Sequence, residues 1–593
     1  MKRRIPLLFF GAVTVMMITL ALILPAAAEE RDGYSYLVSD EEVRIYRGSR
    51  DLSGEVTVPA EIDGYPVTQI GSYAFSGCPN ITGVHLPSSV VKIENGAFSG
   101  CTSLVSVTIP DSVTTMGEDV FKDCTSLKSF TLSRSLTEIP LGTFSGCSSL
   151  ETIIIPDHIQ SVGISAFSSC SSAKEIYIPK SVTEIAYGAF SNCSSVEKIT
   201  IPFVGESLAE NSYRFFATVF GGNNQYSVPQ SLKEVVILSG DIPKGAFEQC
   251  AYIEKIHISD SVSNIHEQAF YRCPSIKEIV VDKNNSVYHS DGNCLIESKT
   301  KRLILGCQSS IIPGDGTVTT IGGYAFGQCS NLKKIVVPNS VQKIECHAFY
   351  GCSSLEEISI PFVGEKAGNT SNTHFGYIFG AGSVESHNPV FIPESLKKVT
   401  ITGDCSIDLD AFSFCRHIVS LTVTSNVKQV REFAFLNCSA LQSVRFEGRL
   451  ETIGQSAFLN CTSLKEILLP DSIQKIGKRV FENCSGVKLL CEEGSVAQQY
   501  AKNNKLAYEV IGKPSEEETL PSRPPETVPV TLPETDSEPT TQIETEAATE
   551  TGSSPQSESE SPDKGKGSTV VIGFVALVAL IAIVALIFRK KKA

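Results

Sequence analysis

Nineteen cysteines are the residues of this chain with the widest range of chemistry, and fourteen of them share one setting. Each of the fourteen follows a phenylalanine by three residues, as Cys78 follows Phe75. The phenylalanines of these pairs are Phe75, Phe98, Phe121, Phe144, Phe167, Phe190, Phe247, Phe270, Phe326, Phe349, Phe412, Phe435, Phe458 and Phe481. Thiols in this number could form disulfides, bind a metal or act as nucleophiles, and their spacing decides among these uses.

The spacing argues against metal binding and catalysis. Zinc sites need Cys or His at short ligand spacings, yet no C-x-x-C occurs and the nine histidines are scattered. The sequence also lacks G-x-S-x-G, P-loop and H-E-x-x-H motifs. A net charge of −15 argues against nucleic-acid partners. We therefore expect no catalytic residue, no metal and no cofactor, and we predict that the protein is not an enzyme.

The elements that hold the cysteines follow from their period, which is 23 residues over most of the ladder. A fixed period between 20 and 50 residues indicates a solenoid of stacked coils. Residues 104–110 read as a strand with Val107 and Ile109 inside, ended by Pro110. Residues 113–116 then return along an opposite wall, and the next phenylalanine enters the core.

Stacking also predicts the state of the thiols. Equivalent cysteines of adjacent coils would lie about 4.8 Å apart and all point inward. Parallel side chains do not offer the crossed geometry of a disulfide, so we interpret the fourteen as small buried apolar side chains. Cys294 and Cys307 flank a predicted hairpin and are the best candidates for a disulfide. Cys346, Cys405 and Cys491 have no predicted place.

The full repeat reads L-x-x-I-x-I-P-x-S-V-x-x-I-G-x-x-A-F-x-x-C, and residues 103–121 and 464–481 carry it almost position for position. This pattern resembles the BspA-type, or Treponema-type, leucine-rich repeat of bacterial surface proteins, over about residues 70–485. The resemblance implies a right-handed, curved, mainly β solenoid with a strand on each wall and little helix. It also implies adhesion or ligand binding rather than a reaction.

Both ends of the chain predict export and anchoring. We assign residues 1–28 to a signal peptide, 29–70 to an N-terminal cap, 71–485 to the solenoid, 486–511 to a C-terminal cap with a helix near 494–502, 512–568 to a disordered Pro/Thr/Ser/Glu stalk, 569–588 to one transmembrane helix and 589–593 to a basic cytoplasmic tail. The protein is thus expected on the surface of a bacterial cell, as a single-pass plasma membrane protein with its N-terminal part outside. Residues 532–536 resemble a sortase signal, but they lie more than thirty residues before the apolar segment, so we interpret them as part of the stalk.

Three inserts interrupt the period, near 202–230, 285–317 and 361–394. The first and third share the sequence I-P-F-V-G-E and a pair of phenylalanines four residues apart, Phe216/Phe220 and Phe375/Phe379. The pairs fit either a loop displayed for a partner or a short helix that packs both rings on the solenoid, and we favour the helix. The middle insert reads as a β-hairpin over 293–307 and resembles the hairpin island of the family.

The outer face of the first wall is the remaining candidate for function. One outward position per coil is mostly Thr, Val, Ile or aromatic, which fits either an interaction surface or ordinary β-propensity. From this column we select His85, Thr108, Thr131, Tyr177, Thr200, His257 and Arg445 as ligand-binding candidates. The predicted function is an adhesin-like protein, expected to be a monomer, that binds an extracellular protein or glycan, such as host matrix or another cell. The alternative is a structural spacer of the cell envelope.

Overall fold

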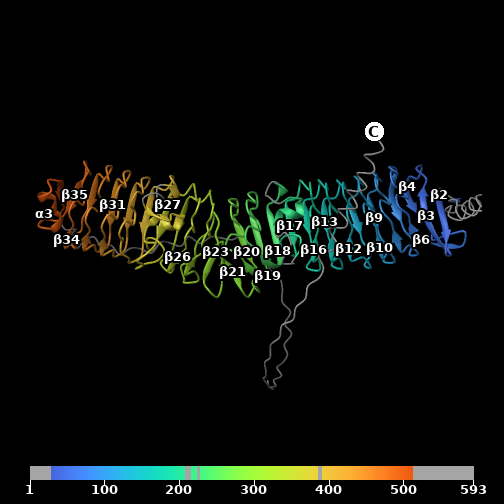
Figure 1. The fold of residues 1–593 in the computed structure, drawn as a ribbon, viewed down its shortest axis with the longest axis horizontal. Helices are drawn as coiled ribbons and strands as arrows, with labels where there is room; N and C mark the ends of the chain where they lie inside the picture. The colour runs from blue at the N-terminus through green and yellow to red at the C-terminus, as the bar shows by residue number, and fades with distance from the viewer. Residues whose placement is uncertain (1–28, 32, 208–214, 223–226, 385–389, 512–593) are drawn as a thin grey trace, which may run out of the picture. The chain divides into compact units, whose positions relative to one another are not determined.

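The computed structural model describes residues 29–31, 33–207, 215–222, 227–384 and 390–511. The chain separates into compact units 1–515 and 516–593, and the second unit lies outside the described residues, as do the predicted signal peptide, stalk and transmembrane helix. The first unit is a stack of short β-coils, with strands of one coil beside those of the next (Figure 1). The predicted mainly β solenoid is confirmed.

The first wall consists of parallel strands that begin at the leucine-rich part of each coil. In chain order they are β4 (Gly54–Thr57), β7 (Ile81–His85), β9 (Ser106–Thr108), β11 (Ser129–Thr131), β13 (Thr152–Ile154), β15 (Glu175–Tyr177), β17 (Lys198–Ile201), β18 (Glu234–Ile242), β19 (Lys255–Ile265), β20 (Glu278–Val281), β25 (Lys334–Val336), β27 (Glu357–Ile360), β28 (Lys398–Ile401), β29 (Ser420–Val423), β31 (Ser443–Phe446), β33 (Glu466–Leu468), β35 (Lys488–Cys491) and β36 (Ala507–Val510). Ser106 pairs with Ser129, 23 residues later, so the sequence period is the strand register.

The second wall is built from shorter strands. They are β6 (Tyr65–Ile70), which also pairs with β5 (Glu61–Ile62), then β8 (Lys92–Ile93), β10 (Thr115–Met116), β12 (Glu138–Ile139), β14 (Ser161–Val162), β16 (Glu184–Ile185), β24 (Thr320–Ile321), β26 (Lys343–Ile344), β30 (Gln429–Val430), β32 (Thr452–Ile453) and β34 (Lys475–Ile476). The coil predicted from residues 104–117 is confirmed, because Val107 and Ile109 are buried and Ser106 and Thr108 are exposed.

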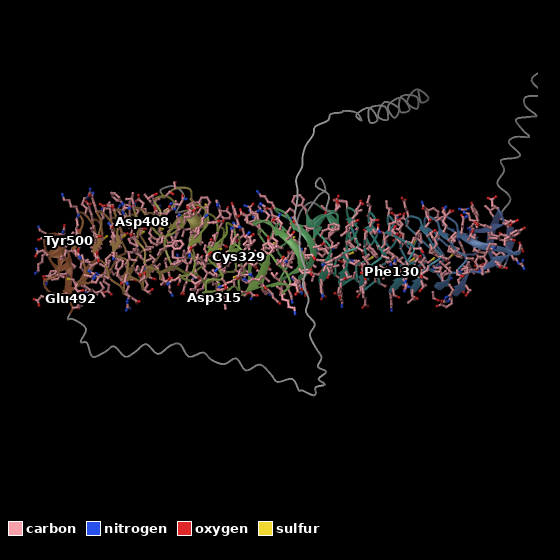
Figure 2. The ribbon with its side chains drawn as sticks, turned by 90° about the horizontal axis from the view of Figure 1, so that it is seen from below. Phe130, Asp315, Cys329, Asp408, Glu492 and Tyr500 are labelled. Carbon is pink, nitrogen blue, oxygen red and sulfur yellow. The ribbon has the colours of Figure 1, made fainter. Side chains whose placement is uncertain are left out.

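A column of phenylalanine rings fills the interior. All fourteen ladder phenylalanines are at most 5% exposed. The centroids of Phe75 and Phe98 are 5.1 Å apart with ring planes at 5°, and those of Phe435 and Phe458 are 4.8 Å apart at 4°. Parallel rings at these distances gain both apolar burial and aromatic contact. Phe130 adds a ring from the first wall, 4.4 Å from Phe144 (Figure 2).

The first and third inserts continue this column. Their phenylalanine pairs lie on short 3-10 helices, η1 (Phe216–Phe220) and η3 (Phe375–Phe379), and all four rings are buried. The Phe216 N–H donates to the Ala246 carbonyl at 2.9 Å, as the Phe167 N–H does to Ala189 at 2.8 Å. Each insert is thus a coil of altered length, and the interpretation that both rings pack on the solenoid is confirmed.

The middle insert divides the core instead of continuing it. The predicted hairpin is present as β22 (Cys294–Glu297) and β23 (Arg302–Leu305), and a further strand, β21 (Tyr288–Asp291), pairs with β22. Leu295 and Leu305 belong to the core on the N-terminal side, whereas Ile296 and Leu303 belong to the core on the C-terminal side. The hairpin therefore contributes side chains to two different cores, one on each of its sides.

The hairpin repeats the design of the N-terminal cap. There β1 (Glu29–Arg31), β2 (Tyr34–Ser39) and β3 (Glu42–Gly48) form an antiparallel meander, and β3 pairs in parallel with β6. The strands β21, β22 and β23 form the same meander, and β23 pairs in parallel with β24. Gly48 faces the first ring of one column, and Gly306 faces Phe326, the first ring of the other; a Cβ at either position would lie under 3 Å from that ring.

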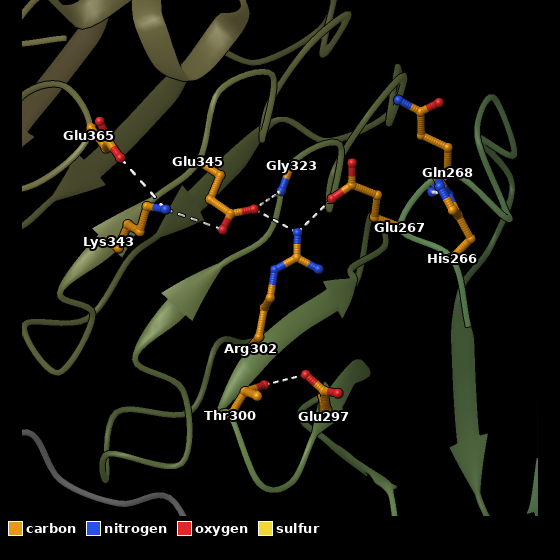
Figure 3. A network of polar contacts seen from close by, with 10 residues as sticks. All are labelled: His266, Glu267, Gln268, Glu297, Thr300, Arg302, Gly323, Lys343, Glu345 and Glu365. Atoms are coloured by element: carbon orange, nitrogen blue, oxygen red, sulfur yellow. Dashed lines mark hydrogen bonds and ion pairs between the residues drawn. The ribbon is translucent and has the colours of Figure 1, made fainter. Parts of the chain in front are cut away.

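One arginine anchors each meander. Arg44 Nη2 lies 2.6 Å from Glu94 Oε2 at the N-terminal cap. Arg302 Nη2 lies 2.6 Å from Glu345 Oε2, and the same nitrogen lies 2.6 Å from Glu267 Oε2 in the coil before the hairpin (Figure 3). Arg302 thereby joins the two halves of the solenoid.

The C-terminal end is closed by α3 (Val496–Asn503) and β36. The Ser495 side chain accepts a hydrogen bond from the Gln498 N–H, so the predicted N-cap is confirmed. Tyr500 of this helix packs edge-on against Phe481, the last ring of the column, at 6.2 Å. No helix in the part of the chain that the structure describes reaches the length and hydropathy of a membrane span.

Candidate binding face

The candidate column lies in register on the outer face of the first wall. Ile154 pairs with Tyr177, Tyr177 with Thr200, and Thr200 in turn with Val236. Val236 continues to His257. Thr108 and Thr131 pair in the N-terminal part of the wall, where His85 lies one coil earlier. The structure thus places the residues of the column side by side within successive sheets.

Apolar side chains of the column are exposed. Ile154 is 59% exposed, Tyr177 is 38% exposed and Val336 is 51% exposed. Thr108, Thr131 and His85 are also exposed, whereas His257 is half-buried. β-Branched and aromatic residues suit strands on any face, so their presence alone proves no ligand. Their exposure and shared register nevertheless give the wall an apolar stripe, which is interrupted where Thr200 is buried.

The position of Thr200 differs from the prediction that it is an exposed ligand-binding residue. Its side chain is only 5% exposed and cannot meet a ligand in this conformation. The register supplies the reason, because the short Thr200 side chain stands between the larger Tyr177 and Val236 on the adjacent coils. Outward alternation along a strand therefore does not ensure exposure.

A column of alternating charge lies beside the apolar stripe and was not predicted. Glu175, Lys198, Glu234, Lys255 and Glu278 occupy one register position on successive coils. Lys198 Nζ lies 3.2 Å from Glu175 Oε1, and Lys255 Nζ lies 3.1 Å from Glu278 Oε1. Cross-strand pairs of opposite charge stabilise a sheet modestly. They also leave the apolar stripe bordered by neutralised charge.

Two charged or titratable candidates have intramolecular partners. Arg445 Nε lies 3.2 Å from Glu447 Oε1, and His85 Nε2 lies 3.1 Å from Glu55 Oε2. Both pairs are largely solvent-exposed, so each contributes little to stability and can be exchanged for a ligand group. Arg445 and His85 remain available for polar recognition at the two ends of the wall.

The cysteine ladder has no reactive geometry. All nineteen thiols are free, and the fourteen of the ladder are buried. The Cys101 thiol donates to the Phe75 carbonyl at 3.2 Å, and the Cys124 thiol donates to the Phe98 carbonyl at 3.3 Å. Burial raises the pKa of the Cys101 thiol to about 12. Because the thiolate is the nucleophile and the metal ligand, these side chains act as core residues, which confirms their predicted role.

The predicted Cys294–Cys307 disulfide is a second correction, since both thiols are free. The two side chains belong to different core clusters. The Cys294 sulfur lies 3.6 Å from the Gly292 carbonyl, and the Cys307 sulfur lies 3.7 Å from the Asn293 carbonyl. Their proximity in the hairpin therefore does not bring the two sulfurs into a bond. Among the described residues, no group of three or more His, Cys, Asp or Glu side chains could hold a metal ion.

The chain matches the model of a known protein family. The family model for the BspA type leucine rich repeat region matches residues 68–197, 137–217, 305–372 and 387–500, in six copies. These ranges cover more than half of the chain. The chain belongs to the BspA-type leucine-rich repeat family. This membership agrees with the repeat pattern and with the two-walled stack.

Solved structures of bacterial leucine-rich repeat proteins are similar to the chain. A leucine-rich repeat protein from Bacteroides ovatus ATCC 8483 is 22% identical, with 82% of this chain and 100% of that chain covered and a TM-score of 0.30. A leucine rich cell surface protein from Faecalibacterium prausnitzii A2-165 is 22% identical, with coverage of 80% and 97% and a TM-score of 0.27. The pneumococcal vaccine antigen PcpA is 18% identical, with coverage of 82% and 98% and a TM-score of 0.24. No curated protein matches the chain.

Proposed function

We propose that this BspA-type protein is a surface-anchored, adhesin-like binding protein whose first wall engages an extracellular protein or glycan. The rigid stack supplies an extended face, and the segment 569–588 anchors the chain in the plasma membrane. Solenoids commonly use such extended faces for binding. The family membership and the lack of catalytic motifs in the sequence both support a binding role.

The observation that carries this proposal is the apolar stripe, in which Ile154, Tyr177 and Val336 are exposed. Alternating Lys and Glu beside it are already paired, so the stripe lacks the strong net charge that would limit its partner to one polarity. Tyrosine is enriched in binding interfaces because one ring offers both apolar area and a hydroxyl group. His257 extends the stripe with a second polar ring.

Residues 29–511 carry both caps and the described core, so they are the fragment to test. We expect this fragment to bind saturably to at least one matrix protein or glycan on an array. Changing Tyr177, His257 and Arg445 to Ala should weaken that binding, and Tyr177→Ala should cost about 1–2 kcal/mol of binding free energy. The matched control is Tyr46→Ala, because Tyr46 is 52% exposed but lies on the N-terminal cap.

Two outcomes would contradict the proposal. Absence of saturable binding to any cell or matrix preparation would favour the alternative, a structural spacer of the envelope. Equal loss of binding in the Tyr46→Ala and Tyr177→Ala variants would show that the stripe is not the contact surface. Anchoring is tested separately, because deletion of 569–593 should release the protein from the membrane fraction without changing array binding.

A further inference from the structure

The turns that carry the cysteines form a ladder of their own on one edge of the solenoid. Within uninterrupted runs of coils, the residue before a ladder cysteine donates its N–H to the next coil, as Gly100 does to the Lys122 carbonyl at 2.7 Å and Gln249 to the Tyr271 carbonyl at 3.0 Å. This ladder resumes at Gln328, which donates to Tyr350 at 2.6 Å. Among the described residues, such a bond is missing before each of the three inserts, at Asn192, Arg272 and Gly351, and after Arg272 the chain forms the hairpin, which has no Phe-x-x-Cys turn.

A pocket occupies the place of the missing turn. Its volume is about 430 Å³, and its lining includes Gln230, Gln249, Tyr252, Arg272, Pro274 and Gln328. The Asn331 side chain donates to the Pro274 carbonyl at 3.5 Å and so joins the two sides of the gap. A volume of this order accommodates a small ligand. The pocket is therefore a direct result of the hairpin insert.

Arg272 is the one charged residue of the lining. Its guanidinium carbon lies 5.4 Å from the centre of the Tyr271 ring, and that ring packs edge-on against Tyr324 across the gap at 5.6 Å. In the described part of the chain, no carboxylate lies within ion-pair distance of Arg272, although most other coils pair their cations. The guanidinium thus has a fixed aromatic support and unused donors for an anionic ligand group.

The other lining groups favour hydroxyl-bearing ligands. The side-chain amides of Gln230, Gln249 and Gln328 each offer a donor and an acceptor, which is what vicinal hydroxyl groups require. Tyr252 is 44% exposed, and Lys233 Nζ lies 5.5 Å from the centre of its ring. An aromatic ring at a pocket wall packs well against the C–H face of a sugar.

We propose that this pocket binds a sugar residue that bears a carboxylate, with Arg272 paired to the carboxylate and the glutamine amides bonded to the hydroxyl groups. An acidic peptide would also pair with Arg272, so the test below compares a sugar acid with a Glu-rich peptide. The site lies on the turn edge rather than on the outer face of the first wall. It is therefore independent of the binding function proposed for that wall.

The test uses residues 29–511 with N-acetylneuraminic acid and glucuronic acid as probes, followed by saturation-transfer NMR and titration. We expect saturable binding of at least one acid, and loss of binding when its carboxylate is converted to the methyl ester. Arg272→Gln should weaken binding about tenfold or more, since a charged hydrogen-bonded pair is lost. Tyr252→Ala should also weaken it.

Arg416→Gln is the matched control. Arg416 is an exposed arginine beside a ladder cysteine, and its guanidinium carbon lies 5.9 Å from the centre of the Phe414 ring. This variant should bind the acids as the parent does, and so should Tyr177→Ala. The proposal is overturned if neither acid binds, if the methyl esters bind equally well, if Arg272→Gln keeps full affinity, or if a Glu-rich peptide displaces the sugars at lower concentration.

Discussion

Arg302 Nη2 and Glu267 Oε2 lie 2.6 Å apart and connect two segments that belong to different core clusters of the solenoid. Among the described residues, the carboxylate paired with the equivalent arginine of the N-terminal cap, Arg44, is Glu94 on its C-terminal side. Between Phe270 and Phe326 the ring column is interrupted by the hairpin, so polar contacts replace ring stacking at this junction. The stability of the junction should therefore respond to changes that leave the coils untouched.

Removal of the Arg302 charge tests the junction. We expect Arg302→Met to lower the free energy of unfolding by about 1–2 kcal/mol, because the partly buried Glu345 carboxylate loses the nearer of its two cations and keeps only Lys343 at 3.5 Å. Denaturant unfolding followed by tyrosine fluorescence measures the change. Lys334→Met, which removes an exposed cation of the wall, should have a much smaller effect. Equal effects of the two substitutions would show that Arg302 has no special role.

A buried ring of the column is expected to contribute far more to the free energy of unfolding than a ring at the surface. Phe167→Ala should lower the free energy of unfolding by about 3–5 kcal/mol, because Phe167 is fully buried between Phe144 and Phe190. The control is Phe215→Ala, since the Phe215 side chain is 41% exposed. Hydrogen exchange should locate the loss near the altered coil, because a solenoid transmits strain mainly to its neighbours.

The first cap should carry an acid-sensitive contribution. The hydrogen bond from Arg44 lowers the pKa of Glu94 to about 2 from an ordinary value of 4.5. Because the pKa of Glu94 is lower in the folded protein than in the unfolded chain, the ionised carboxylate stabilises the fold at pH values above its unfolded pKa. This stabilisation is lost as the pH falls from about 4.5 toward 2. Glu94→Gln should flatten the pH dependence of unfolding in that range. Glu118→Gln, at an exposed glutamate, should leave it as in the parent.

Thiol labelling tests the burial of the cysteine ladder. In the native protein, iodoacetamide should react with partly exposed Cys346 before any ladder cysteine, because the ladder thiols are buried and burial raises the pKa of Cys147 and Cys250 to about 12. After denaturation all nineteen should react. Mass spectrometry of tryptic peptides identifies the labelled sites. Rapid native labelling at Cys147 would contradict the buried column.

The hairpin should act as a start cap for the second half of the solenoid. We expect residues 286–511 alone to be folded, because their first meander covers Phe326 as β1, β2 and β3 cover Phe75. Residues 318–511 lack that cover, so they should aggregate or remain unfolded. Circular dichroism and thermal unfolding compare the two fragments. A folded 318–511 fragment would show that the hairpin is dispensable.

The repeated part of the fold could be predicted from the sequence because every coil carries the same pattern of residues. Period, strand alternation and the inward rings were therefore readable from the unit at 104–117. The hairpin was readable as two strands, but its partition of the core was not, because both of its faces are apolar and sequence alone does not say which core each residue joins. The burial of Thr200 depends on the sizes of Tyr177 and Val236, which are distant in sequence.

The candidate sites show the same limit. The apolar column was predicted because its members recur at one position of the repeat. The pocket at Arg272 was not, because it results from the absence of a turn at one place and its lining comes from several coils. The spacing of 56 residues between Phe270 and Phe326 marks an interruption of the ladder, but the gaps from Phe190 to Phe247 and from Phe349 to Phe412 are 57 and 63 residues, so spacing alone does not single out this place.

The alternating Lys and Glu of the first wall bear on how nearly identical coils assemble in the right order. If one coil were skipped during folding, Glu175 would pair with Glu234, or Lys198 with Lys255. Like charges placed directly opposite each other destabilise a strand pair. On the five coils from Glu175 to Glu278, the alternation thus penalises out-of-sequence pairing that the uniform phenylalanine and cysteine positions would tolerate, and it distinguishes the true neighbour of each of these coils from the next one along.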